Sequence, residues 1–191
     1  MDKETAIKSL IAERKSYRAF TDQSITREQL GELLYAAHMA ASCFNEQPWR
    51  FICATKQDEH YPRVFDCLND WNQQWAGAAG ALIITVAATR FAKNSKPNRF
   101  YMHDVGLATS QMSLRAVAMG LAVHPMAGFH SDKARQNFHI PDDFEPVTAL
   151  AIGYPGDPNN LPEDMRSSET GPRDRRPLSD VWFGGDWQQS Y

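Results

Sequence analysis

Short apolar runs alternate with helical patterns along residues 1–154, and this alternation limits the chain to a sheet covered by helices. We expect strands at the short apolar runs, which occupy residues 50–55, 81–88, 123–126 and 147–154. We expect helices where apolar residues recur at helical spacing, over residues 5–15, 26–41, 61–68, 70–80, 100–119 and 131–139. A layered α/β or α+β fold follows, but not a standard dinucleotide fold, because no strand precedes a G-x-G-x-x-G motif.

Three positions mark helix ends. Thr26 can cap the second helix, and Gln29, three residues later, completes a capping box. Gly120 is placed to stop the long helix, since glycine tolerates the left-handed backbone that follows a helix end. Ser131 is placed to cap the helix that precedes the last strand.

Size and charge exclude several classes of protein. A chain of 191 residues with 42% hydrophobic residues builds one compact domain, with or without an arm, and needs no disulfide or metal to hold its core. Its 20 basic and 23 acidic residues give a net charge of −3, which argues against nucleic acid and anionic membrane surfaces as partners. Residues 76–89 form the longest weakly polar run, and they are too few to span a bilayer.

The cysteines and the first residues indicate a reducing compartment. Cys43, Cys53 and Cys67 form no C-x-x-C pair, so neither a disulfide framework nor a structural zinc site is indicated. The six histidines include no H-E-x-x-H motif, and nothing orients a base toward Cys43 for nucleophilic catalysis. The charged N-terminus lacks a secretory signal, and we expect a cytoplasmic protein.

The chain changes character after Tyr154. Residues 155–191 hold five of the eleven prolines, no amphipathic helix of useful length is expected there, and the segment cannot build a core of its own. It nevertheless carries large apolar side chains that are costly to leave in water: Val181, Trp182, Phe183, Trp187 and Tyr191. We therefore expect an arm that packs on another surface, with a partner subunit favoured over a disordered tail.

Two segments in the first third of the chain offer binding groups. Residues 14–18, Arg-Lys-Ser-Tyr-Arg, combine guanidinium groups with a hydroxyl, which suits a phosphate dianion, although such clusters are commonly solvated surface. Residues 42–49, Ser-Cys-Phe-Asn-Glu-Gln-Pro-Trp, offer hydroxyl, thiol and amide groups that suit the edge of a polar heterocycle. The alternative for the second segment is an ordinary loop between helix and strand.

Two later segments add to them. Residues 173–178 bring three more arginines. Residues 125–129, Pro-Met-Ala-Gly-Phe, end a predicted strand with small residues that let a flat ligand approach the backbone.

Together these segments resemble the nitroreductase family of FMN-dependent NAD(P)H oxidoreductases. Residues 14–20 are similar to the family's R-R-S-x-R-x-F, and residues 41–49 to its P-S-S-x-N-x-Q-P-W. Asp104 and Gly106 in a helix, residues 127–129, and residues 153–155 followed by 173–178 continue the resemblance in order. Ala41 and Cys43 depart from the family pattern, and Phe44 fills its variable position, so the resemblance does not define the substrate.

The resemblance implies an α+β fold, a three-layer α/β/α sandwich with a central mixed sheet. Residues 1–154 would form the FMN-binding core, and residues 155–191 a C-terminal extension exchanged with the partner in a homodimer that binds two FMN at its interface. The phosphate and ribityl chain would be held by Arg14, Ser16, Arg18, Arg173 and Arg175. Further flavin contacts would come from Lys15, Ser42, Cys43, Asn45, Gln47, Asn72, Met126, Ala127 and Gly128.

The implied activity is ping-pong transfer of hydride from NADH or NADPH, through flavin N5, to an electron-poor acceptor such as a nitroaromatic or a quinone. A backbone N–H in residues 126–128 would donate to N5, and no side chain need act as a catalyst because the flavin carries the chemistry. The alternative is an FMN-binding carrier or regulatory module with little turnover.

Overall fold

The computed structural model describes residues 2–189. Its strands are β1 (Trp49–Thr55), β2 (Ala81–Ala88), β3 (Ala122–Met126) and β4 (Phe144–Gly153). Its α-helices are α1 (Lys3–Glu13), α2 (Arg27–His38), α3 (Tyr61–Phe65), α4 (Asp70–Ala76), α5 (Tyr101–Ala118), α6 (Ser131–Phe138) and α7 (Glu163–Thr170). Three short 3-10 helices complete the elements: η1 (Cys43–Asn45), η2 (Pro158–Asn160) and η3 (Leu178–Asp180).

The four strands form one sheet in the order β1-β2-β4-β3, and every neighbouring pair is antiparallel. The mixed sheet expected from the sequence is therefore wrong for the described residues. Helices between strands are typical of parallel crossovers. Here, however, Thr55 at the end of β1 lies opposite Ala81 at the start of β2, so α3 and α4 close a connection at one end of the sheet.

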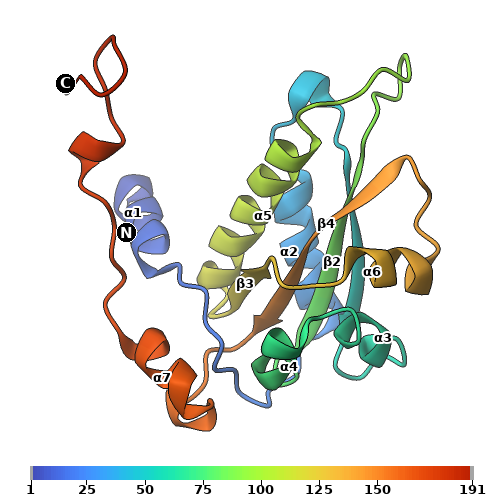
Figure 1. The fold of residues 1–191 in the computed structure, drawn as a ribbon. Coiled ribbons are helices and arrows are strands. Elements are labelled where there is room, and N and C mark those ends of the chain that lie inside the picture. The colour runs from blue at the N-terminus through green and yellow to red at the C-terminus, as the bar shows by residue number, and fades with distance from the viewer. Residues whose placement is uncertain (1, 190–191) are drawn as a thin grey trace.

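Helices cover both faces of this sheet (Figure 1). Side chains of β2 alternate between two buried clusters, as the two-residue period of a strand requires. Ile83 packs in the cluster formed with α2 and α5, and Ile84 packs in the cluster formed with α3, α4 and α6. The helix–sheet–helix layering agrees with the expected α+β class.

Most predicted boundaries hold to within three residues. The Thr26 capping box is present, with Gln29 N donating to Thr26 Oγ1 at 3.2 Å and Thr26 N donating to Gln29 Oε1 at 3.0 Å. Gly120 follows the end of α5 with a φ of 71°, which only glycine adopts without strain. The prediction that Ser131 caps α6 is wrong. The N-cap residue of α6 is His130, and its side chain makes no capping hydrogen bond.

The first part of the extension packs on its own chain. Gly156 N donates to Ala19 O at 2.8 Å, and Leu161 and Met165 are buried in the sheet's core. The α7 helix, which spans eight residues and buries Met165 and Glu169, was not expected from the sequence.

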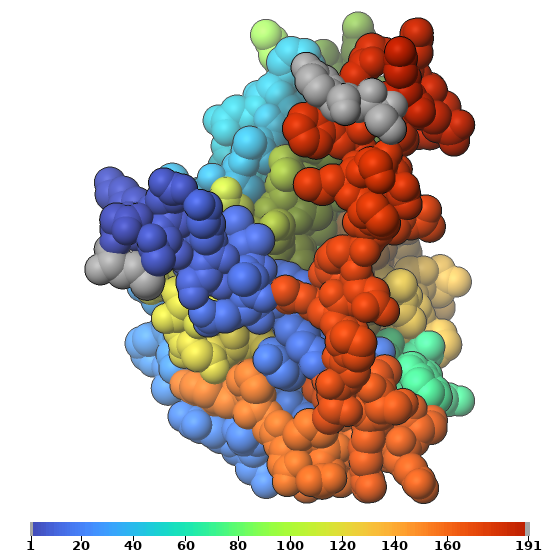
Figure 2. All heavy atoms as spheres, turned by 90° about the vertical axis from the view of Figure 1, so that its left-hand side faces the viewer, coloured from blue at the N-terminus to red at the C-terminus, as the bar shows by residue number. Residues whose placement is uncertain are grey.

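Residues 172–189 run past α1 along the surface, with α5 visible between them (Figure 2). Leu178 and Trp187 are 69% and 82% exposed there. Tyr191, one of the aromatic residues expected to pack, lies outside the described residues. No helix among residues 2–189 has the length and apolar character needed to cross a membrane.

Candidate functional site

Three arginines from opposite ends of the chain gather where α1 ends. Arg14 is the C-cap of α1, and the Arg173 guanidinium donates to the carbonyl oxygens of Ala12, at 2.5 Å, and Arg14. These carbonyls have no partner within the helix, so the bonds fix the tail against the helix end. Burial, followed by the positive charges of Arg173 and Arg175, lowers the pKa of Arg14. Within residues 2–189 no carboxylate pairs with any of the three, so the cluster carries uncompensated positive charge, which favours an anion.

A concavity of about 380 Å³ opens beside this cluster. Arg14 Nη1 donates to Ser16 Oγ at 3.4 Å, and both side chains line it. The α5 helix, the end of β3 and the middle of β4 supply the remaining lining residues: Met102, Val105, Gly106, Thr109, Ser110, Ser113, Pro125, Val147 and Thr148. The concavity thus combines the Arg14 guanidinium and several hydroxyl groups with a mostly apolar wall.

The end of β3 presents free backbone donors near the concavity. Within the described residues, the N–H groups of Ala127 and Gly128 donate to no other group, and Ala127 is exposed. Asn72 Nδ2 donates to Gly128 O at 2.8 Å, and Thr148 Oγ1 donates to Met126 O at 2.8 Å. A Cβ at Gly128 would lie 2.5 Å from the Asn69 amide, so a larger residue there would displace that side chain.

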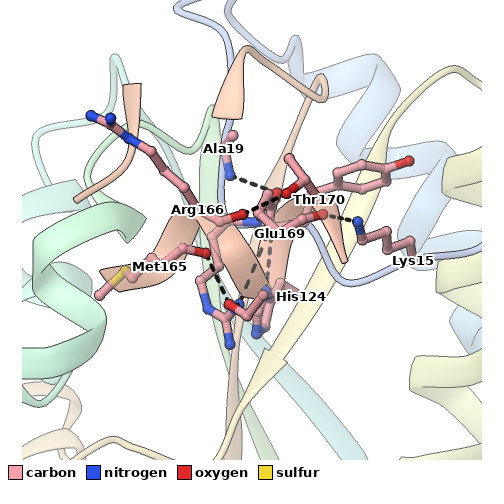
Figure 3. Close-up of polar contacts among 10 residues, drawn as sticks. Lys15, Ala19, His124, Met165, Arg166, Glu169 and Thr170 are labelled. Atoms are coloured by element: carbon pink, nitrogen blue, oxygen red, sulfur yellow. Dashed lines mark hydrogen bonds and ion pairs between the residues drawn. The ribbon is translucent and has the colours of Figure 1, made fainter. Parts of the chain in front are cut away.

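Lys15 and Arg18, which the sequence groups with Arg14, contact Glu169 of α7 instead. Figure 3 shows Lys15 and Ala19 beside Glu169. Glu169 Oε1 accepts from Arg18 N at 2.9 Å and Ala19 N at 3.1 Å, and the Lys15 ammonium donates to Glu169 O. The Arg18 guanidinium lies 4.0 Å from Glu169 Oε2 and donates to Ser168 Oγ at 3.2 Å. The cationic cluster predicted at residues 14–18 is therefore divided. Lys15 and Arg18 contact Glu169, whereas Arg14 lines the concavity.

Glu169 itself was not predicted. Its side chain is 1% exposed, and Oε2 is buried without a hydrogen bond among the described residues. The only signal in the sequence is an acidic residue in a proline-rich tail, which is ordinarily solvated. Its partners lie far away along the chain, so only the folded structure shows it.

His124 joins β3 to the 14–18 segment. Its Nδ1 lies 2.8 Å from Tyr17 O, and its ring lies against the Trp75 ring, with centroids 4.6 Å apart. Burial lowers the pKa of His124; the hydrogen bond to Tyr17 opposes that shift. The arrangement keeps the 14–18 segment beside the end of β3.

Residues 42–47, which hold the predicted flavin contacts Ser42, Cys43, Asn45 and Gln47, lie apart from the arginines. Ser42 Oγ accepts from Gln47 N at 2.9 Å, the Gln47 side chain donates to Asn45 O at 3.1 Å, and Cys43 N donates to Asp104 Oδ2 at 3.1 Å. None of these four residues lines the concavity beside Arg14. Within one chain, the structure therefore brings together the arginines, Ser16 and the end of β3, but not residues 42–47.

The described residues contain no group of three or more histidine, cysteine, aspartate or glutamate side chains arranged to hold a metal ion. The fold and the site define an α+β protein with a concavity beside a cationic cluster that joins both ends of its chain.

Comparison with known proteins identifies the family. The nitroreductase family matches residues 11–71 and 66–154. The crystal structure of an oxidoreductase containing FMN is 34% identical, covers 95% of this chain and 92% of its own, and has a TM-score of 0.89. An uncharacterized 15.4 kDa protein of Mycolicibacterium smegmatis is 33% identical over 134 residues, 70% of this chain and 88% of that protein. The FMN reductase (NADPH) of Bacillus subtilis is 25% identical over 162 residues, 76% of this chain and 64% of that enzyme.

The chain therefore belongs to the nitroreductase family, as the motifs at residues 14–20 and 41–49 indicate. Membership confirms the enzyme class expected from the sequence, an NAD(P)H flavin oxidoreductase of this family. The individual contact residues stay predictions.

Proposed function

We propose that the protein binds FMN and transfers hydride, in ping-pong order, from NADH or NADPH to an electron-poor small molecule such as a nitroaromatic or a quinone. When bound, FMN would supply the chemistry of hydride transfer between the nicotinamide and the acceptor. The names of two relatives, an oxidoreductase containing FMN and an FMN reductase (NADPH), support the proposal.

The observation that carries the proposal is the unpaired cluster of Arg14, Arg173 and Arg175. Three positive charges held together repel one another; burial of Arg14, followed by the charges of Arg173 and Arg175, lowers its pKa. A phosphate dianion relieves the repulsion and accepts several guanidinium hydrogen bonds. The FMN phosphate is such a group, and Ser16 adds a hydroxyl beside it.

The remaining contacts follow from the same placement. In the proposal, the apolar wall of the concavity packs against the flavin, and the N–H of Ala127 or Gly128 donates to flavin N5. Asn72 and Thr148 hold the carbonyls of this segment, so its N–H groups keep a fixed direction. Lys15 and Arg18 contribute positive charge near the flavin, reduced by the carboxylate of Glu169.

Ser42, Cys43, Asn45 and Gln47 enter the proposal through a partner subunit. Their segment lies outside the concavity of its own chain, so contact with the same FMN requires a second copy. The proposed active form is therefore a homodimer in which each site takes residues from both chains.

The visible absorption spectrum of the purified protein tests the proposal. We expect two flavin bands that bleach when NADH or NADPH is added without oxygen. Bound flavin that stays oxidised would favour the carrier or regulatory module. A colourless protein that takes up no added FMN would contradict both.

Loss of Arg14 or Arg175 tests the phosphate site. Arg14→Ala and Arg175→Ala should each weaken FMN binding by about 1–3 kcal/mol, the range for a charge-assisted hydrogen bond. Riboflavin, which lacks the phosphate, should bind the variants and the unchanged protein equally. Arg27→Ala, at the exposed start of α2, serves as the control, and unchanged FMN affinity in both variants would refute the assignment.

A further inference from the structure

A second cavity, of about 590 Å³, lies between the 42–47 segment and the turn that follows β2. Two aromatic rings meet at it. Phe44 and Phe91 pack edge to face with centroids 5.9 Å apart, and Phe44 is 90% exposed. The other lining residues are Glu46, Lys93, Asn94, Lys96 and Pro97. An exposed aromatic pair beside a cavity offers stacking surface for a planar ligand.

Hydrogen bonds hold both walls of this cavity in place. The turn is closed by Phe91 N donating to Lys96 O at 2.9 Å and by the Arg90 guanidinium donating to Ser95 O at 2.9 Å. Ala92 N donates to Glu46 Oε1 at 2.7 Å and ties the turn to the 42–47 segment. A ligand there does not have to order a loose loop before it binds.

The backbone at Phe44 strengthens the case that its position is functional. Phe44 adopts a left-handed conformation with a φ of 53°, which is costly for a bulky side chain. The ring gains little from burial in return, since it is 90% exposed in the single chain. Strain of this kind persists where the surrounding structure imposes it, and it is common at ligand sites.

The charge of the cavity favours an anionic ligand. The ammonium groups of Lys93 and Lys96 make no ion pair or hydrogen bond among the described residues. Glu46 is the one carboxylate in the lining, and its Oε1 is already bonded to Ala92 N. The cavity therefore carries a net positive charge beside its aromatic rings.

We propose that this cavity binds a planar aromatic group that carries an anionic substituent, with the ring on Phe44 and Phe91 and the anion at Lys93 and Lys96. The proposal rests on the proposed function for its biological meaning. Two sources in that reaction have this chemistry: an aromatic acceptor with a carboxylate, and the adenosine of NADPH with its 2′-phosphate. The cavity thus adds a second cationic surface, separate from the arginines proposed to bind the FMN phosphate.

Binding to the FMN-loaded protein tests the proposal without any turnover, by isothermal titration calorimetry. The probes are 4-nitrobenzoate against neutral 4-nitrobenzamide, and adenosine 2′,5′-bisphosphate against adenosine 5′-monophosphate. In the Lys93→Gln/Lys96→Gln variant we expect one anionic probe to bind about tenfold more weakly, since two ion pairs at a half-open site together contribute about 1.4 kcal/mol. The less charged counterpart should change less than twofold.

The pair of probes that responds identifies the source. A loss confined to 4-nitrobenzoate assigns the cavity to the acceptor, and a loss confined to the bisphosphate assigns it to NADPH. Lys56→Gln/Lys133→Gln removes the same charge far from the cavity and should leave both affinities unchanged. Phe91→Ala should weaken the charged and the less charged aromatic probes alike.

Unchanged affinity of both anionic probes in the Lys93→Gln/Lys96→Gln variant would overturn the proposal, as would equal loss in the control variant. Because these measurements need no hydride transfer, they stand even if NADH and NADPH fail to bleach the flavin. Such a failure would contradict the proposed function alone.

Discussion

Glu169 joins the two ends of the chain that build the arginine cluster. Its carboxylate accepts hydrogen bonds from the backbone N–H groups of residues 18 and 19, and its carbonyl oxygen accepts one from the Lys15 ammonium. Four residues further on, Arg173 binds the end of α1. The position of Arg173 and Arg175 relative to Arg14 therefore depends on Glu169.

Glu169→Ala should lower the free energy of unfolding by about 1–3 kcal/mol, because it leaves the buried N–H groups of Arg18 and Ala19 unpaired. It should also reduce the preference for FMN over riboflavin, since the arginines lose their alignment on the phosphate. Glu169→Gln keeps an acceptor oxygen and should restore most of that preference. Glu163→Ala, at the exposed start of α7, is the control. Titrations with both flavins check this, and an unchanged preference in Glu169→Ala would show that Glu169 only stabilises the fold.

His124 gives the stability of the fold a pH dependence. Burial lowers its pKa below the usual 6.5, so the folded protein holds the ring neutral where the unfolded chain binds a proton. The stabilisation of the fold by the neutral His124 ring is full above about pH 6.5. It is lost as the pH falls through the pKa of His124 in the folded protein. The melting temperature should therefore fall more steeply below pH 6.5 in the unchanged protein than in His124→Gln. The same dependence of melting temperature on pH in both proteins, from pH 7.5 to 5, would contradict this role.

The sequence predicts the residues of local motifs better than the residues that depend on tertiary contacts. Arg14 and Ser16 lie together because they are neighbours in one segment, and the pattern of that segment indicates an anion site. Glu169 and His124 act through partners more than one hundred residues away, which no local pattern encodes. The same limit hid the pairing of Arg18 with Glu169.

The strands and helices follow the same distinction. Apolar runs located all four strands, but a run carries no information on strand direction, and the sheet proved antiparallel rather than mixed. The α7 helix escaped prediction because Met165 is the single large apolar residue in it. Its burial depends on a surface provided by the core, so its own periodicity is too weak to indicate a helix.

Gly156 tests how closely the extension must approach the core. A Cβ there would lie 2.6 Å from the backbone of Phe20, which cannot rotate away as a side chain can. Gly156→Ala should therefore cost about 1–3 kcal/mol of stability, as overpacking does, and should weaken FMN binding by displacing α7 and Arg173. Gly31→Ala, in α2 with open space around it, should instead stabilise by about 0.5–1 kcal/mol. Urea unfolding of the two variants measures both effects, and equal stability would contradict the close approach.

Exposed apolar side chains on one chain argue for a second copy. Leu178, Trp187 and Ile11 are 69%, 82% and 58% exposed, and they come from the extension and α1, which run past each other on the surface in Figure 2. Met102 on α5 is 59% exposed beside the arginine concavity. A protein that stayed monomeric would rarely leave so many large apolar groups in water. The proposed arm exchange covers them and brings residues 42–47 of the partner to the concavity.

Removal of residues 178–191 separates assembly from the site within one chain, because Arg14, Arg173 and Arg175 remain. We expect the full chain to sediment as a dimer and the shortened chain as a monomer with weakened FMN binding, since the partner's contacts are lost.

Mixing two defective variants gives the sharper result. If each site draws on two chains, an Arg14→Ala chain and a Gln47→Ala chain, each defective alone, should form heterodimers in which one site has neither defect. FMN affinity and NAD(P)H-dependent bleaching should then recover in part on mixing. A dimeric shortened chain would contradict the arm exchange, and absence of recovery would place both residues in the site of a single chain.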